Sequence, residues 1–353
     1  MKMNRVFVAS ALAGIITTMA ISANGPEAKV ERLSKEVDQL VPADPHMEKM
    51  ATGYTWTEGP VWIHTGFLMY AEIPSNSIYK LKPGSAPELF LRPSGWTDAK
   101  PFGGKEPGSN GMTLDARGRL TVAGHARRNV YRLETLDPKG KVTVLADRYE
   151  GKRFNSPNDL VYSKDGSLYF TDPPYGLATQ SDDDPMKELK FNGVFRLANA
   201  LNHAPGAPPA NQDLRLLVSD ITRPNGLAFS PDEKYLYVNS SDLKKKIWMR
   251  YEVADGKLIN GKLIYDATSD PRIGGPDGMK VDRLGNLYST GPGGIWIFSP
   301  ELKHIGTIIV PERAGNLAWG DEDGKSLYIA ASSSIYRVKL KVEGIRPWLP
   351  LGK

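Results

Sequence analysis

The stretch SPNDLVYSKDGSLYFTD, residues 156–172, decides the fold because its pattern recurs along the chain. A polar residue lies in a short stretch that contains Pro or Gly. This stretch is followed by an apolar segment, a turn and a second apolar segment. Asp165-Gly166 is typical of the tight turn of a β-hairpin. The stretch therefore predicts two antiparallel strands with a polar residue, Asn158, at the entrance to the first.

Five further segments share this pattern. They are TEGPVWIHTGFLMYAEI from Thr57, SNGMTLDARGRLTVAG from Ser109, RPNGLAFSPDEKYLYVNSS from Arg223, GPDGMKVDRLGNLYSTG from Gly275 and GNLAWGDEDGKSLYIAASS from Gly315. A third strand is predicted after several of them, as in SIYKL from Ser77 and NVYRL from Asn129. Each of the six segments has a polar residue at the position equivalent to Asn158. Consecutive ones, from Glu58 in the first segment to Asn316 in the last, are separated by 52, 48, 67, 52 and 39 residues. Antiparallel strands that repeat at this spacing are typical of propeller blades, so six repeats predict an all-β, six-bladed β-propeller.

Composition excludes several classes of protein. The 353 residues carry a formal net charge of +5 and their mean hydropathy is −0.37, which is typical of a soluble globular chain. The basic residues are scattered, so we expect no nucleic-acid partner. The chain has no cysteine, which excludes disulfides, thiolate nucleophiles and Cys-ligated metal sites. The sequence carries no signal for an oligomeric state.

The N-terminal residues 1–23 read as a secretion signal. Lys2 and Arg5 precede an apolar stretch that ends in small residues at 20–23. This predicts a periplasmic or secreted protein with no stable membrane insertion after cleavage, and an uncleaved membrane anchor is the alternative. Residues 24–50 are expected to form a lead-in with one short amphipathic helix. The propeller is assigned to residues 51–353.

The six polar residues at equivalent positions predict a metal site on the propeller axis. They are Glu58, Asn110, Asn158, Asn225, Asp277 and Asn316. Each precedes the first strand of its repeat, so all six are expected to converge at one end of the axis. Oxygen donors without His or Cys suit Ca²⁺, although such a site also accepts Mg²⁺ or Mn²⁺.

At these residues the chain resembles the SMP-30/gluconolactonase/luciferin-regenerating-enzyme (LRE) family, and within it the bacterial gluconolactonases. The resemblance covers roughly residues 53–347. It is carried by EGPVW from Glu58, SPNDL from Ser156 with YFTDPPYG after it, RPNGLAFSPD from Arg223, GPDGMKVD from Gly275 and GNLAWG from Gly315.

The resemblance implies a set of metal ligands and a substrate pocket. Motif by motif, the metal ligands fall on Glu58, Asn158, Asn225 and Asp277. Asn110 and His125 match residues that line the substrate pocket, and Asn158 belongs to the metal shell or lies just outside it against the substrate. Bacterial relatives often have Cys-Glu before this histidine, where the present chain has Ala123-Gly124.

The implied reaction is the hydrolysis of a sugar-type lactone that depends on Ca²⁺. The cation polarises the lactone carbonyl and a water attacks it. Asp277 is the predicted general base. Because a bound cation lowers the basicity of its ligand, the alternative is that the metal acidifies the water and Asp277 only positions it.

Two other functions are compatible with the same sequence. One is an aryl-ester or organophosphate hydrolase that uses the same site. The other is a non-catalytic propeller that Ca²⁺ stabilises and that binds a partner, since propellers host many functions. The chain has no Gly-x-Ser-x-Gly or His-Glu-x-x-His motif, so serine-hydrolase and zinc-protease functions lack their characteristic residues.

Overall fold

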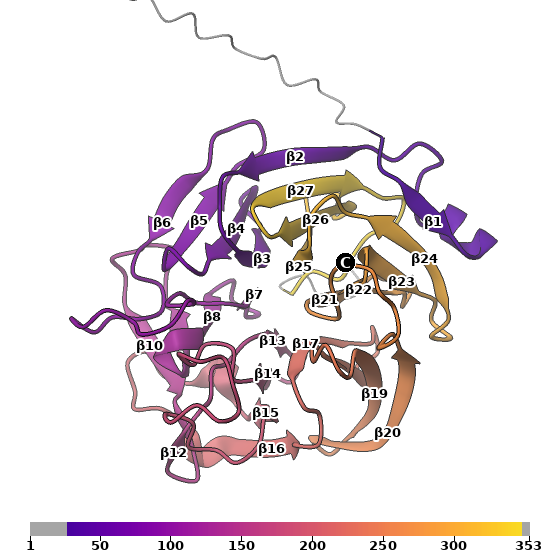
Figure 1. The fold of residues 1–353 in the computed structure, drawn as a ribbon. Coiled ribbons are helices and arrows are strands. Elements are labelled where there is room, and N and C mark those ends of the chain that lie inside the picture. Colours follow the sequence, from indigo (N-terminus) through magenta and orange to yellow (C-terminus); the bar gives the residue numbers. More distant parts are fainter. Residues whose placement is uncertain (1–26, 348–353) are drawn as a thin grey trace, which may run out of the picture.

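The computed structural model describes residues 27–347, and the predicted signal segment 1–23 lies outside this range. Within it, six antiparallel sheets of four or five strands are arranged around one axis (Figure 1). The predicted six-bladed all-β propeller is therefore confirmed. The predicted hairpin turns, such as Asp165-Gly166, each connect the first and second strands of a blade.

In blades 1 to 4 the strands follow the chain from the axis outward, and in blades 5 and 6 a strand from the N-terminal segment is added at the outer edge. In blades 1 to 3 they are β3 (Thr57–Ile63), β4 (Phe67–Glu72), β5 (Ser77–Leu81), β6 (Glu88–Leu91), β7 (Met112–Leu114), β8 (Leu120–Gly124), β9 (Asn129–Leu133), β10 (Val142–Ala146), β13 (Leu160–Tyr162), β14 (Leu168–Asp172), β15 (Gly193–Leu197) and β16 (Leu214–Val218). In blades 4 to 6 they are β17 (Pro224–Phe229), β18 (Tyr235–Ser240), β19 (Ile247–Ala254), β20 (Lys257–Asp266), β21 (Met279–Val281), β22 (Leu287–Gly291), β23 (Gly294–Phe298), β24 (His304–Ile309), β25 (Ala314–Gly320), β26 (Ser326–Ala331) and β27 (Ser334–Lys339).

The innermost strands form a closed circle. Strand β3 contacts β7, and the contacts continue through β13, β17, β21 and β25 back to β3. Figure 1 shows these six strands nearest the axis. The residues at the start of each inner strand therefore meet at one end of the axial channel.

The N-terminal segment differs from the predicted lead-in. Instead of an amphipathic helix, it contains β1 (Val30–Arg32), the short 3₁₀ helix η1 (Lys35–Gln39) and β2 (Met47–Thr52). Strand β1 extends the fifth sheet beside β24, and β2 pairs with β27, with Met47 opposite Val338. The propeller thus begins before residue 51, and its last blade is completed by a strand from the other end of the sequence.

Aromatic side chains pack between neighbouring blades. Trp248 of blade 4 stacks on Trp296 of blade 5 with ring centroids 5.1 Å apart, and both rings are buried. Trp62 of blade 1 stacks on Tyr328 of blade 6 at 5.3 Å. Stacked pairs of this kind add about 0.5–1.5 kcal/mol to the free energy gained by burying their area. They hold the blades together without disulfides.

The remaining elements lie outside the blades. A hairpin of β11 (Arg148–Tyr149) and β12 (Lys152–Arg153) precedes blade 3, and the 3₁₀ helices η2 (His125–Arg127), η3 (Ala200–Asn202) and η4 (Asn211–Asp213) lie in connections. Within residues 27–347 the structure has no helix long and apolar enough to span a membrane.

Candidate metal centre

The six polar residues predicted to converge lie at the same end of the axis. Glu58, Asn225 and Asn316 are in the first residues of β3, β17 and β25, and Asn110, Asn158 and Asp277 stand two residues before β7, β13 and β21. All six are buried. They share a place at the start of an inner strand, and we call them the axial ring.

Hydrogen bonds between neighbouring blades connect the axial ring at three of its junctions. The backbone N–H of Gly111 donates to the carbonyl of Asn158 at 2.7 Å, and that of Gly278 donates to Gly315 at 2.8 Å. The hydroxyl of Thr171 donates to the carbonyl of Asn225 at 2.7 Å. These hydrogen bonds fix the position of one ring residue relative to the next.

Two carboxyl groups of the axial ring, those of Glu58 and Asp277, are buried. Burial, helped by the negative charges of Asp159 and Glu106 and opposed by a hydrogen bond from the N–H of Gly59, raises the pKa of Glu58 to about 7. Burial also raises the pKa of Asp277 well above its ordinary value, with Glu58 as the next cause. Arg313, which lies over the ring of Trp56, acts in the opposite direction on Asp277. The two carboxylates therefore repel each other in a site that favours added positive charge.

Amide oxygens of the axial ring also lack partners. Within residues 27–347, the Oδ1 atoms of Asn110 and Asn225 are buried and accept no hydrogen bond. A buried oxygen without a donor or cation costs free energy. Two buried carboxylates beside such oxygens form a hard donor set without nitrogen or sulfur, which fits a cation such as Ca²⁺.

The same part of the chain contains no cluster of three or more His, Asp or Glu side chains arranged for a metal. An ion here would therefore depend on amide oxygens as well as on Glu58 and Asp277. Of the predicted ligands, Asn225 has a free buried oxygen, and Asn158 is buried with its backbone fixed by Gly111 and Thr171. Ligation by these four residues stays a prediction.

Asn316 is occupied by other groups. Its Oδ1 accepts from the N–H of Leu317 at 2.8 Å and lies 3.5 Å from the Nζ of Lys280. Its Nδ2 lies 3.5 Å from Asp159, whose carboxylate is 3.9 Å from the same Nζ. Asp159, Lys280 and Asn316 thus form a polar layer beside the axial ring.

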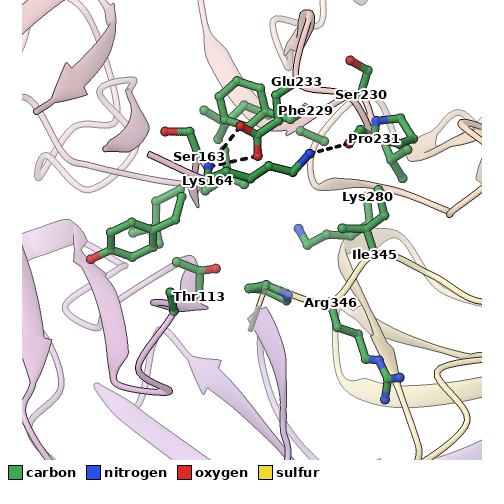
Figure 2. A pocket seen from close by; sticks show the side chains of 18 of the residues that line it. Thr113, Ser163, Lys164, Phe229, Ser230, Pro231, Glu233, Lys280, Ile345 and Arg346 are labelled. Carbon is green, nitrogen blue, oxygen red and sulfur yellow. Dashed lines mark hydrogen bonds between the residues drawn. The ribbon is translucent and has the colours of Figure 1, made fainter. Parts of the chain in front are cut away.

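A cavity of about 520 Å³ lies at the other end of the inner strands. Its walls include Leu227, Phe229 and Ile345, and Lys280 extends into it (Figure 2). No residue of the axial ring lines it. The axial ring and this cavity therefore lie on opposite sides of the polar layer.

His125 lies beside the axial ring in contact with a residue that the sequence analysis missed. Its Nε2 is 2.9 Å from a carboxylate oxygen of Glu106, and its Nδ1 is 3.3 Å from the carbonyl of Pro157. The side-chain amide of Gln180 donates to the other oxygen of Glu106 at 2.7 Å. Glu106 and Gln180 belong to loops that have no counterpart in the other repeats, so the repeat pattern gave no signal for them.

Comparison with known proteins agrees with this architecture. The family model described as the SMP-30/gluconolactonase/LRE-like region matches residues 56–333. A protein named gluconolactonase from Zymomonas mobilis is 38% identical over 325 residues, which cover 90% of this chain and 87% of the relative.

Two solved structures have the same fold. A gluconolactonase from Xanthomonas campestris superposes with a TM-score of 0.73 at 27% identity, covering 92% of this chain and 99% of that one. A calcium-binding protein, regucalcin, from Agrobacterium tumefaciens superposes with a TM-score of 0.64 at 17% identity, covering 94% and 100%. The family model spans more than half of the sequence and the blades correspond, and the chain therefore belongs to the SMP-30/gluconolactonase/LRE-like family.

Proposed function

We propose that this protein hydrolyses sugar-type lactones, such as gluconolactone, at the axial ring with the help of a divalent cation. Ca²⁺ is the cation proposed in preference to Mg²⁺ or Mn²⁺. The class of reaction is supported by the gluconolactonase of Z. mobilis, which matches nearly the whole chain. The observation that carries the site is the pair of buried carboxyl groups, Glu58 and Asp277, beside buried amide oxygens that lack partners.

Glu58, Asn158, Asn225 and Asp277 would hold the cation. Bound there, a dication supplies a Lewis acid for the ester carbonyl and for the oxyanion that forms from it. Asn110 is proposed to contact the ring of the lactone. His125, which the sequence predicts to line the pocket, is fully buried against Glu106 and would act on the substrate only through that residue. A site built from loops of several blades can select the substrate by its hydroxyl groups.

Asp277 is the proposed base. It is 8% exposed, against 2% for Glu58, so it is the more open of the two carboxyl groups. Its carboxylate would accept a hydrogen bond from the attacking water and orient the water's lone pair toward the carbonyl carbon.

Proton release from δ-gluconolactone, corrected for spontaneous hydrolysis, tests the function. The wild type with Ca²⁺ should exceed the spontaneous rate, EDTA should remove the excess, and Asp277→Ala should remove it in the presence of Ca²⁺. A wild type that opens no member of a lactone panel would disprove the proposal. Turnover of aryl esters but not lactones would instead assign an esterase.

We also propose that the protein is exported by residues 1–23 and acts outside the cytoplasm. N-terminal sequencing of the protein recovered from the periplasm or medium checks this. A mature chain that begins near residue 24 is the expected result, and a chain retaining residues 1–23 in the membrane fraction would indicate an anchor.

A further inference from the structure

Glu106 and His125 form a fixed pair at the edge of the axial ring. Glu106 lies in the loop between β6 and β7, and His125 begins η2 directly after β8. The carboxylate of Glu106 has one oxygen 2.9 Å from His125 and the other held by Gln180 at 2.7 Å. Both oxygens have a partner, so the orientation of this carboxyl group is set by the protein.

Within the pair, only the side chain of Glu106 is exposed to solvent. Its side chain is 21% exposed, whereas that of His125 is fully buried. The charge of Glu106 also contributes to raising the pKa of both Glu58 and Asp277. Glu106 is therefore near enough to the two axial carboxyl groups to act on their charge, and His125 is shielded from solvent.

The hydrogen-bond partners of His125 indicate where the protons of the Glu106–His125 pair lie. The carbonyl of Pro157 can only accept a hydrogen bond, so Nδ1 carries the proton of that contact. A neutral ring would then present the lone pair of Nε2 to Glu106, which satisfies both groups only if Glu106 is protonated. If Glu106 is ionised, the ring must be an imidazolium. With Nδ1 protonated, the pair therefore holds one transferable proton.

We propose that Glu106, positioned by His125, is the general acid that protonates the leaving oxygen of the lactone. The inference rests on the proposed function and adds the second proton transfer that ring opening needs. The oxygen of water forms a bond to the carbonyl carbon while its proton passes to Asp277. The bond from that carbon to the ring oxygen then breaks, and the pair gives its proton to the departing oxygen. Solvent finally returns the proton from Asp277 to the pair, so the products are the hydroxy acid and a restored site.

This division of roles follows from where the carboxyl groups lie. Glu58 and Asp277 belong to the axial ring, where a bound cation would oppose protonation. Glu106 lies outside the axial ring, and His125 can supply it with a proton through their 2.9 Å contact. An alkoxide is a poor leaving group, so protonating it is worth about 10²–10⁴ in rate, the usual contribution of general acid catalysis.

The test compares two lactones that differ in their leaving group. δ-Gluconolactone releases an alkoxide, whereas dihydrocoumarin releases a phenolate that departs without an acid. With saturating Ca²⁺, Glu106→Gln should lower kcat for δ-gluconolactone about 10²-fold or more and kcat for dihydrocoumarin by less than threefold, with KM little changed. His125→Asn should change the ratio of the two rates in the same direction.

Glu88→Gln is the matched control, because it makes the same chemical change on β6, outside the site. Calcium binding, measured by isothermal titration calorimetry, should be the same in Glu106→Gln and the wild type. Three results for Glu106→Gln would overturn its role as the general acid but not the proposed function. They are equal rate losses on both lactones, no loss on either lactone, and a loss of calcium binding. A wild type that opens neither lactone would overturn the proposed function and this inference together.

Discussion

The side-chain amide of Asn239 connects two residues of neighbouring blades at the axial ring. Its Nδ2 donates to the main-chain carbonyl of Asp277 at 2.5 Å, and its Oδ1 accepts from the N–H of Gly226 at 3.1 Å. Gly226 directly follows Asn225. One buried amide on β18 therefore sets the spacing between a carboxylate and an amide of the proposed metal site.

Replacing Asn239 should weaken both the fold and the metal site. Asn239→Ala leaves a buried carbonyl and a buried N–H without partners, each of which costs about 1–3 kcal/mol. Asn239→Asp keeps the acceptor for Gly226 but cannot donate to Asp277 when ionised. We expect both variants to bind Ca²⁺ more weakly in calorimetry. If both keep wild-type affinity, Asn239 does not set the geometry of the site.

Gly226 is needed for the close approach of blades 4 and 5. A Cβ built on Gly226 would overlap the carbonyl oxygen of Asp277, whereas a Cβ on Gly275 would lie 3.9 Å from the nearest atom of Lys246. Overpacking of this kind costs about 1–3 kcal/mol. Gly226→Ala should therefore lower the Tm and the calcium affinity, while Gly275→Ala should change neither. Equal behaviour of the two variants in thermal unfolding would contradict this reading of the contact.

Much of this architecture could be predicted from the sequence because each blade repeats a local signal. The polar residue, the apolar strand and the Gly-containing turn lie close together in the sequence, so Asn158 and Asp277 could be aligned without a structure. The pairing of β2 with β27 could not, because it joins Met47 to Val338 and leaves no local period. Glu106 was missed for the same reason. Its partners His125 and Gln180 come from loops that do not repeat, and only the fold brings them together.

Calcium should stabilise the folded chain through the axial ring. A ligand that binds only the folded state at 100 times its Kd adds about 2.7 kcal/mol to the free energy of unfolding. We expect Ca²⁺ to raise the Tm of the wild type in calorimetric scans and to raise that of Glu58→Gln much less, because this variant loses a carboxylate of the site. Glu88→Gln should respond like the wild type. A Tm that Ca²⁺ leaves unchanged in the wild type would argue against a metal site at the axial ring.

The stability of the metal-free protein should fall as the pH rises from 6.5 to 8.0. Asp172 is fully buried where it accepts N–H groups of Asn155 and Ser156, and burial raises its pKa to about 7. An unfolded aspartate titrates near 3.9, so the folded state binds the extra proton between these values, and its stabilising effect is lost as the pH passes 7. Glu58 acts in the same direction.

His304 acts in the opposite direction but at lower pH, since burial lowers its pKa to about 4. An unfolded histidine titrates near 6.5, so the contribution of His304 is largely complete above that pH. With EDTA present, Tm should therefore be lower at pH 8.0 than at pH 6.5. Asp172→Asn should reduce this difference, and His304→Gln should leave it nearly unchanged. A Tm that stays level or rises across this interval would contradict the prediction, because folding would then take up no proton at Asp172 and Glu58.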